Sequence, residues 1–110
     1  MQRYGSVIGI HPEKIAEYKR LHMAVWPEVL EIIKNCNISN YSIFLREPEN
    51  LMFSYFEYHG SDFAKDMARM AADPGTQAWW KLCGPCQQPL PTRTTGEWWA
   101  SMMEVFHCNS

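Results

Sequence analysis

Stretches rich in β-branched and aromatic residues alternate with stretches of helical periodicity, and this alternation predicts an α+β fold. The order along the chain is strand, helix, strand, strand, helix, strand, without an internal repeat or a low-complexity segment. That order is typical of the ferredoxin-like split βαβ, a four-stranded antiparallel sheet with helices on one face. The opposite face would be partly bare and apolar, which favours a homodimer.

Length and composition predict a single domain over residues 1–110. The chain has 110 residues, of which 46% are hydrophobic, enough for one compact core. Its formal net charge of -2, with Lys and Arg scattered, offers no basic surface, so we expect no nucleic acid partner. The N-terminal residues lack a signal-peptide pattern and no stretch has the length of a membrane span, so we expect a cytoplasmic protein without a membrane partner.

The first strand is predicted over residues 3–10, a short β-branched run around two glycines. A helix follows from Pro12, which suits a first helical position, to about Asn35. Pro27 interrupts this helix, because proline removes an amide donor and disfavours helical angles at Trp26. We therefore expect a kink or a short break at this point.

His22 stands within the apolar stripe of this helix and is the candidate centre of any chemistry. Tyr18 precedes it by four residues and Trp26 follows it by four, so the three rings share one helix face and can line one pocket. A histidine in such a stripe is more commonly a hydrogen-bonded core residue than a catalytic one. The pattern alone leaves both interpretations open.

Two strands, over residues 38–46 and 51–58, are joined by a short turn and predict a hairpin. Alternation in the first of them places four side chains on one face: Ser39, Tyr41, Ile43 and Leu45. If this face is turned toward the first helix, Tyr41 approaches His22.

A second helical region carries a pair of tryptophans. Asp62 is expected to cap a helix that closes at Asp73, and Thr76 to cap a shorter helical piece with Trp79 and Trp80. Adjacent helical residues point about 100° apart, so at most one of the two indoles packs wholly in the core. The other can stack on a ligand or contact a dimer partner.

Residues 84–96 are rich in Pro, Gln, Thr and Gly and predict a long surface loop, after which residues 98–106 form the last strand. At the start of the loop, Cys83-Gly-Pro-Cys86 has the spacing of a thioredoxin-type redox motif. In that chemistry the first cysteine lies at a helix N-terminus, where the dipole lowers the pKa of the thiol. Here Cys83 follows a predicted helix, so we prefer the interpretation of a turn with two reduced cysteines.

Five segments occur in one order along the chain: Tyr18-x-x-x-His22, Trp26-Pro27-Glu28, Asn40-Tyr41-Ser-Ile-Phe-Leu45, Trp79-Trp80-Lys81 and Glu104-Val-Phe106. With this order and spacing, the chain from about residue 3 to residue 107 resembles the L-rhamnose mutarotase family. The resemblance implies a dimeric ferredoxin-like enzyme that interconverts the α and β anomers of a 6-deoxy-L-sugar.

The same resemblance implies roles for individual residues. His22 would be the proton donor, and four aromatic residues would bind the sugar: Tyr18, Tyr41, Trp79 and Trp80. Residues 23–25 and the segment 83–88 depart from the pattern of rhamnose members, and the second of them looks like that of a branch linked to L-fucose use. Both L-rhamnose and L-fucose are therefore candidate substrates.

The chemistry of these side chains is compatible with mutarotation. The reaction opens and closes a sugar ring with one acid and one base, and a histidine with an ordinary pKa near ~6.5 offers both protonation states around neutral pH. Indole and phenol rings suit the apolar face and the methyl group of a 6-deoxy sugar. We therefore expect no cofactor and no metal, and Cys36 and Cys108 are too isolated in the sequence to complete a zinc site with Cys83 and Cys86.

Two other classes of function stay open. Related dimeric ferredoxin-like folds serve heme-degrading and quinol-oxidising monooxygenases, and His22 on a helix that faces the sheet could serve such chemistry. A non-enzymatic dimeric stress-type protein with a plain aromatic core is the other alternative. In that case His22 would contribute to stability alone.

Overall fold

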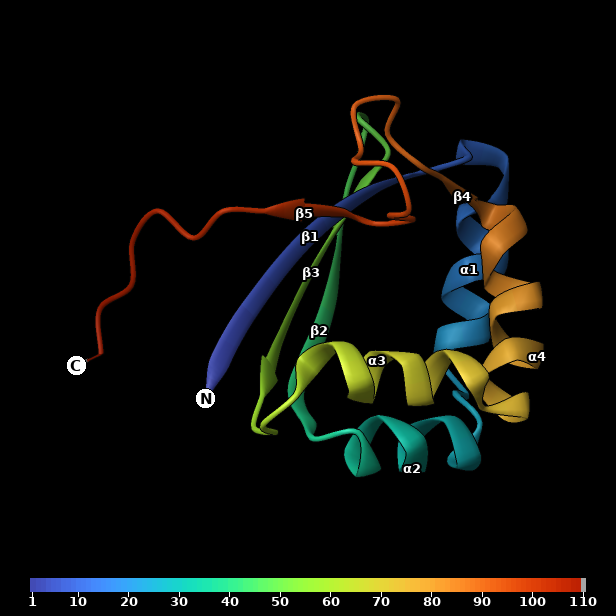
Figure 1. Ribbon diagram of the computed structural model, residues 1–110. Coiled ribbons are helices and arrows are strands. Elements are labelled where there is room, and N and C mark those ends of the chain that lie inside the picture. The colour runs from blue at the N-terminus through green and yellow to red at the C-terminus, as the bar shows by residue number, and fades with distance from the viewer. Residues whose placement is uncertain (110) are drawn as a thin grey trace.

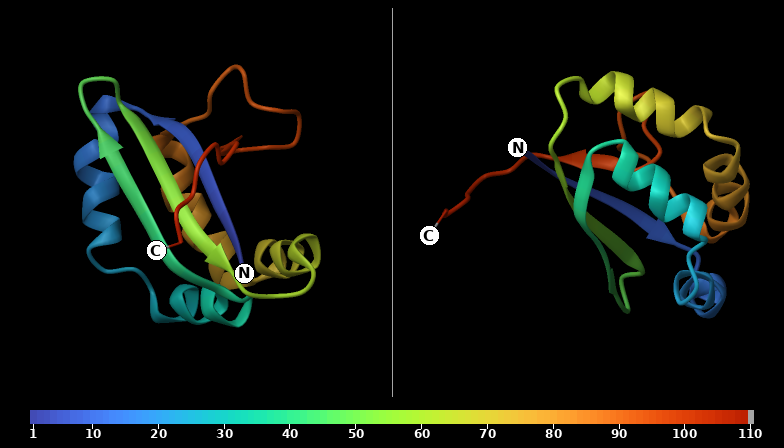
Figure 2. Two further views of the ribbon diagram at one scale, coloured as in Figure 1. Left: turned by 90° about the vertical axis from the view of Figure 1, so that its left-hand side faces the viewer. Right: turned by 90° about the horizontal axis from the view of Figure 1, so that it is seen from below.

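A curled antiparallel sheet carries four α-helices on one face in the computed structural model, which describes residues 1–109 (Figure 1). The strands are β1 (Gln2–Ile10), β2 (Ile38–Arg46), β3 (Leu51–Tyr58), β4 (Gln87–Gln88) and β5 (Ala100–Met102). The α-helices and 3-10 turns are η1 (Pro12–Lys14), α1 (Ile15–His22), α2 (Pro27–Asn35), α3 (Phe63–Ala72), α4 (Pro74–Cys83) and η2 (Gly84–Cys86). The predicted α+β class, with helices on one face, is confirmed (Figure 2). Within residues 1–109, no helix has the length and apolar character needed to cross a membrane.

The sheet has five strands, not the four that the sequence predicts. Their order is β2-β3-β1-β4, with β5 also pairing on β1, and all pairs are antiparallel. β4 and β5 pair with different parts of the same edge of β1. Pairing stops after β4 because Pro89 and Pro91 have no amide to donate to a ladder. The predicted last strand over residues 98–106 shrinks to β5, and the chain beyond it extends away from the sheet (Figure 1).

The predicted break in the first helix is present between His22, where α1 ends, and Pro27, where α2 begins. Trp26 has extended angles, φ -61° and ψ 136°, as a residue before proline prefers. Pro12 likewise stands at the start of η1, where its missing amide costs no hydrogen bond. The two helices leave the break in different directions (Figure 1).

A β-bulge in β2 corrects the predicted alternation of side chains. Asn40 has a positive φ of 51°, and the register with β3 shifts between Ser39 and Ser42. Ser39, predicted to share the face of Tyr41, is exposed, and Ile38 is buried under the helices in its place. The extra residue of a bulge reverses the alternation on one side of it, because side chains in a strand repeat every two residues.

The caps of α3 and α4 are both aspartates. The side chain of Asp62 accepts the amide of Lys65 at 3.1 Å, as predicted for this cap. Asp73, and not Thr76, caps α4, because its carboxylate accepts the Thr76 amide at 2.8 Å and the Thr76 hydroxyl at 3.1 Å. Pro74 takes the first helical position, so the segment expected to close one helix joins two.

Two hydrophobic clusters form the core. The larger packs α1, α2 and α4 against β1 and β3 through Ile8, Ile10, Ile15, Tyr18, Leu21, Val29, Met52, Trp79, Cys83 and Cys86. The smaller joins the ends of α2 and α3 to β2 and β3 through Cys36, Ile38, Tyr58 and Met70.

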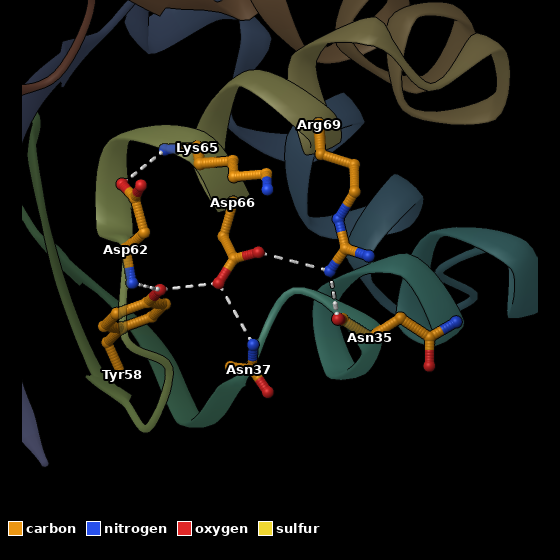
Figure 3. A network of polar contacts seen from close by, with 7 residues as sticks. All are labelled: Asn35, Asn37, Tyr58, Asp62, Lys65, Asp66 and Arg69. Carbon is orange, nitrogen blue, oxygen red and sulfur yellow. Dashed lines mark hydrogen bonds and ion pairs between the residues drawn. The ribbon is translucent and has the colours of Figure 1, made fainter.

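A polar network around Asp66 closes the outer end of the smaller cluster (Figure 3). The hydroxyl of Tyr58 donates to Oδ2 of Asp66 at 2.5 Å, and Nδ2 of Asn37 donates to the same oxygen at 3.0 Å. Arg69 contacts the other carboxylate oxygen at 3.3 Å and donates to the backbone carbonyl of Asn35. The network therefore ties α3 to α2 and β3.

Asp66→Asn should lower the melting temperature at neutral pH, because an amide cannot accept from all of these donors. Hydrogen bonds from Tyr58 and Asn37 hold the pKa of Asp66 below its ordinary value of 3.8. A depressed pKa in the folded state contributes stability that is present above the unfolded pKa and lost as the pH falls through the folded one. The difference between wild type and variant should therefore narrow below about pH 4.

Thermal unfolding followed by circular dichroism at neutral and acidic pH checks this expectation. Glu31→Gln removes an exposed carboxylate from α2 and is the control, which should match wild type at both pH values. A difference between Asp66→Asn and wild type that does not vary with pH would contradict the role of the carboxylate charge.

Candidate active site

A cavity of about 580 Å³ lies between α1, α2, α4 and the helix-facing side of the sheet. Apolar side chains form most of its wall: Ile10, Ile15, Val25, Val29, Leu30, Ile33, Ile43, Leu45, Met52 and Met70. The five predicted site residues also line it: Tyr18, His22, Tyr41, Trp79 and Trp80. The fold thus brings together side chains from α1, β2 and α4 in a cavity of the size that holds small ligands.

His22 is the last residue of α1, and one of its ring nitrogens is held by the helix. Nδ1 lies 2.9 Å from the backbone carbonyl oxygen of Tyr18. A carbonyl oxygen only accepts, so Nδ1 carries a hydrogen and, in the neutral ring, Nε2 has the free lone pair. The ring also stacks on that of Tyr18 with centroids 4.2 Å apart, as the four-residue spacing predicted. Nε2 is therefore the nitrogen left for exchange of a proton.

The two tyrosines differ in exposure, yet desolvation raises the pKa of both phenols. Tyr18 is 6% exposed, and burial raises the pKa of its phenol far above the ordinary value of 10. Tyr41 is 42% exposed, and desolvation also raises the pKa of its hydroxyl. Both phenols therefore stay neutral at physiological pH, a form suited to hydrogen bonding.

Trp79 and Trp80 occupy different environments on α4. Trp79 is 5% exposed, and its ring meets those of His22 and Trp26 edge to face, with centroids 5.4 Å and 5.2 Å away. Trp80 is 48% exposed where it lines the cavity. The prediction that at most one indole packs wholly in the core is confirmed, because α4 is helical through both residues.

Sequence reasoning missed several polar residues at this site. Lys19 and Thr76 line the cavity, but an exposed lysine on a helix and a threonine near a helix start carry no signal of a site. Gln87 on β4 is buried, and its side chain donates to the hydroxyl of Tyr18 at 3.2 Å. No pattern indicates that contact, because 69 positions separate the two residues.

The segment from Cys83 to Cys86 has the opposite setting from a redox motif. Cys83 is the last residue of α4, at the negative end of the helix dipole. Burial raises the pKa of the Cys83 thiol to about 12 and also raises the pKa of Cys86. Both thiols are protonated at neutral pH, so neither is a nucleophile. The structure agrees with a turn that contains two reduced cysteines.

The side chains of the cavity suit proton transfer on a small neutral ligand. Within residues 1–109, no group of three or more His, Cys, Asp or Glu is placed to hold a metal ion. His22 supplies an imidazole with a defined tautomer, the phenols supply neutral hydrogen-bonding groups, and the indoles supply flat apolar surfaces. Acid-base isomerisation is the reaction class that this set of groups favours.

Comparisons of sequence place the chain beside one group of proteins. A family model described as L-rhamnose mutarotase matches residues 3–108. The L-rhamnose mutarotase of Oceanobacillus iheyensis is 32% identical over 113 residues, which cover 97% of this chain and 98% of that protein. The L-rhamnose mutarotase of Pectobacterium atrosepticum is 38% identical over 94 residues, which cover 83% of this chain and 85% of that protein.

Two solved structures share the architecture. The crystal structure of an L-rhamnose mutarotase from Formosa agariphila matches with a TM-score of 0.77 over 98% of this chain and 99% of that one, at 21% identity. Tetracenomycin F2 cyclase from Streptomyces glaucescens, a type-II polyketide cyclase, matches with a TM-score of 0.66 over the same shares, at 13% identity. At such identities the likeness concerns the fold alone.

Trp79→Ala and Trp80→Ala should have different effects. Trp79 fills the core, so its truncation should lower the free energy of unfolding by about 3–5 kcal/mol. Trp80→Ala should leave the melting temperature close to that of wild type and should weaken binding of a ligand that stacks in the cavity. Thermal unfolding and calorimetric titration with L-rhamnose and L-fucose measure the two effects.

Leu82→Ala is the matched control, because Leu82 is an exposed apolar residue of α4 outside the cavity wall. It should change neither quantity. Equal losses of affinity in both tryptophan variants, with unchanged melting, would contradict the division of roles.

Proposed function

This chain belongs to the L-rhamnose mutarotase family, and we propose that it interconverts the α and β anomers of a 6-deoxy-L-hexose, L-rhamnose or L-fucose, in the cavity around His22. Membership of the family makes it an isomerase of the mutarotase type. The observation that carries the role of His22 is its hydrogen bond of 2.9 Å to the carbonyl of Tyr18. That bond occupies Nδ1 and leaves Nε2 for the sugar.

In the proposed mechanism, His22 is the proton donor. The protonated imidazole gives its Nε2 proton to the ring oxygen as the bond between the anomeric carbon and the ring oxygen breaks. The anomeric hydroxyl gives its own proton to a solvent water, and the imidazole is left neutral with its lone pair on Nε2. The product is an open-chain aldehyde with the same number of hydrogens as the sugar. Rotation of the carbonyl presents its other face, and closure runs the same transfers in reverse. Imidazole is the side chain best suited to give and take a proton in such a cycle around neutral pH.

The aromatic residues are proposed to bind the sugar. Trp80, half exposed at the cavity, suits stacking on the apolar C–H face, and Trp79 supports the ring of His22 from the side. Tyr18 and Tyr41 line the cavity with neutral phenols, which suit hydrogen bonds to sugar oxygens. A volume of about 580 Å³ leaves room for a hexose and its ring-opened form.

We further propose that two copies of the chain associate through the open face of the sheet (Figure 2). Phe44, Phe53 and Val7 lie opposite one another across β2, β3 and β1 on that face, and Phe44 is 65% exposed. The tail beyond β5 adds three apolar side chains that are 80–89% exposed: Met103, Val105 and Phe106. Exposed apolar surface of this extent favours a partner, and a second copy is the simplest one.

Residues 1–110 are proposed to act as a single ferredoxin-like domain in the cytoplasm. The strand order β2-β3-β1-β4, with helices after β1 and after β3, supports that fold type. The reduced, buried thiols of Cys83 and Cys86 suit a reducing compartment. A net charge of -2 supports the absence of a nucleic acid partner.

His22→Gln should lower the rate of anomer exchange by about 10²-fold or more while the fold is retained. Glutamine can still donate to the Tyr18 carbonyl, but it cannot transfer a proton at neutral pH. Saturation-transfer NMR on the anomeric protons of L-rhamnose and L-fucose measures the exchange and ranks the two sugars.

His59→Gln is the control, because His59 is an exposed histidine just after β3, and it should keep wild-type exchange. Wild-type exchange in His22→Gln would remove His22 from the mechanism. A variant that changes melting temperature alone would favour the non-enzymatic alternative, and a Soret shift on addition of heme would favour a monooxygenase.

A further inference from the structure

A chain of two hydrogen bonds runs behind the cavity from the half-exposed Trp98 through the buried Gln87 to Tyr18. The indole Nε1 of Trp98 donates to Oε1 of Gln87 at 2.7 Å, and Nε2 of Gln87 donates to the hydroxyl of Tyr18 at 3.2 Å. Gln87 is 9% exposed, so loss of either hydrogen bond would leave its amide with little water to replace the missing partner. Gln87 does not line the cavity, and it therefore reaches Tyr18 from outside the space for ligand.

The backbone around the cysteine turn holds Gln87 in this place. Gln87 is the first residue of β4 and pairs with Ile10 at the end of β1. One residue earlier, the carbonyl of Cys86 accepts the amide of His11 at 2.9 Å. Alternation along β4 then buries Gln87 and exposes Gln88. The turn from Cys83 to Cys86, which carries no redox chemistry, thus places Gln87 next to Tyr18.

The direction of the two hydrogen bonds between Trp98, Gln87 and Tyr18 follows from the chemistry of the indole. An indole N–H donates and never accepts, so it must meet the amide oxygen of Gln87. The amide nitrogen of Gln87 is then turned to Tyr18, and because it only donates, the phenol oxygen must accept. The hydroxyl hydrogen of Tyr18 is therefore kept for another partner.

We propose that Gln87, oriented by Trp98, is a positioning residue that makes Tyr18 a hydrogen-bond donor to the sugar oxygen bound beside His22. This inference rests on the proposed mutarotase function of the cavity. The rings of Tyr18 and His22 stack at 4.2 Å, so the two groups serve the same part of the sugar. A substrate oxygen gains negative charge as the ring opens, and a donor already aimed at it in a shielded site lowers the barrier.

Gln87→Glu tests the proposal with a small change of shape. A carboxylate only accepts, so it takes the hydrogens of both Trp98 and Tyr18 and withdraws the Tyr18 donor from the sugar. We expect kcat for anomer exchange to fall by about 10²-fold, the order expected for loss of one such donor, with little change in KM. Gln87→Met keeps the side-chain length but makes no hydrogen bonds. It leaves the Tyr18 hydroxyl free to donate or to accept, so it should lower kcat less than Gln87→Glu does.

Three further measurements separate positioning from plain structural support. Gln88→Glu places the same charge on the exposed neighbour and should leave kcat unchanged. In a Tyr18→Phe background, Gln87→Glu should cause no additional loss, because the hydroxyl on which it acts is gone. The ¹H–¹⁵N signal of the Trp98 indole should keep its hydrogen-bonded shift in Gln87→Glu and move upfield in Gln87→Met.

The outcomes distinguish this inference from the function on which it rests. An active wild type whose kcat is unaffected by Gln87→Glu would overturn the role of Gln87 and leave the mutarotase function standing. An equal loss from Gln87→Glu with Tyr18 present and in the Tyr18→Phe background would also overturn it. If Gln87→Glu does not fold, wild-type kcat in Gln87→Met overturns it. A wild type that accelerates exchange of neither sugar would overturn the function and the inference together.

Discussion

Pro27 is the constraint on which the site depends. Proline cannot continue the helix that ends at His22, and it disfavours helical angles at Trp26, so α1 and α2 leave the break in different directions. This divergence leaves the space of about 580 Å³ between the helices and the sheet. His22 is the last residue of α1, and its Nδ1 lies on the carbonyl of Tyr18 one turn earlier in the same helix. The break therefore opens the cavity beside a residue whose imidazole α1 already orients.

The precision of the site comes from its overlap with the core. Tyr18 and Trp79 belong to the larger hydrophobic cluster and also line the cavity, so the packing that holds the domain together also holds the walls around His22. Edge-to-face contact with Trp79 and stacking on Tyr18 enclose the imidazole from two directions. A site built on packed helices is held more closely than one built on loops. Trp80 differs because it is half exposed and does not belong to the hydrophobic core.

The architecture does not by itself decide the chemistry. A mutarotase from Formosa agariphila and a polyketide cyclase from Streptomyces glaucescens share this fold at 21% and 13% identity. The difference between such proteins must lie in the side chains that face the cavity and in the residues behind them. Here the wall combines His22 with two neutral phenols, and Gln87 behind the wall determines which way one phenol donates its hydrogen.

Features that depend on a few neighbouring residues can be predicted from the sequence. The stacking of Tyr18 on His22 and the break before Pro27 follow from helix geometry and proline sterics, and the hairpin of residues 38–58 follows from strand composition around a turn. The bulge at Asn40 is visible in the folded chain and not in the sequence pattern, because one residue with positive φ reverses the alternation that the sequence suggests. The same holds for the contact of Gln87 with Tyr18, 69 positions away, because that bond exists only when β4 pairs with β1. Local patterns record backbone preferences over a few residues, whereas such contacts depend on how distant segments close around one core.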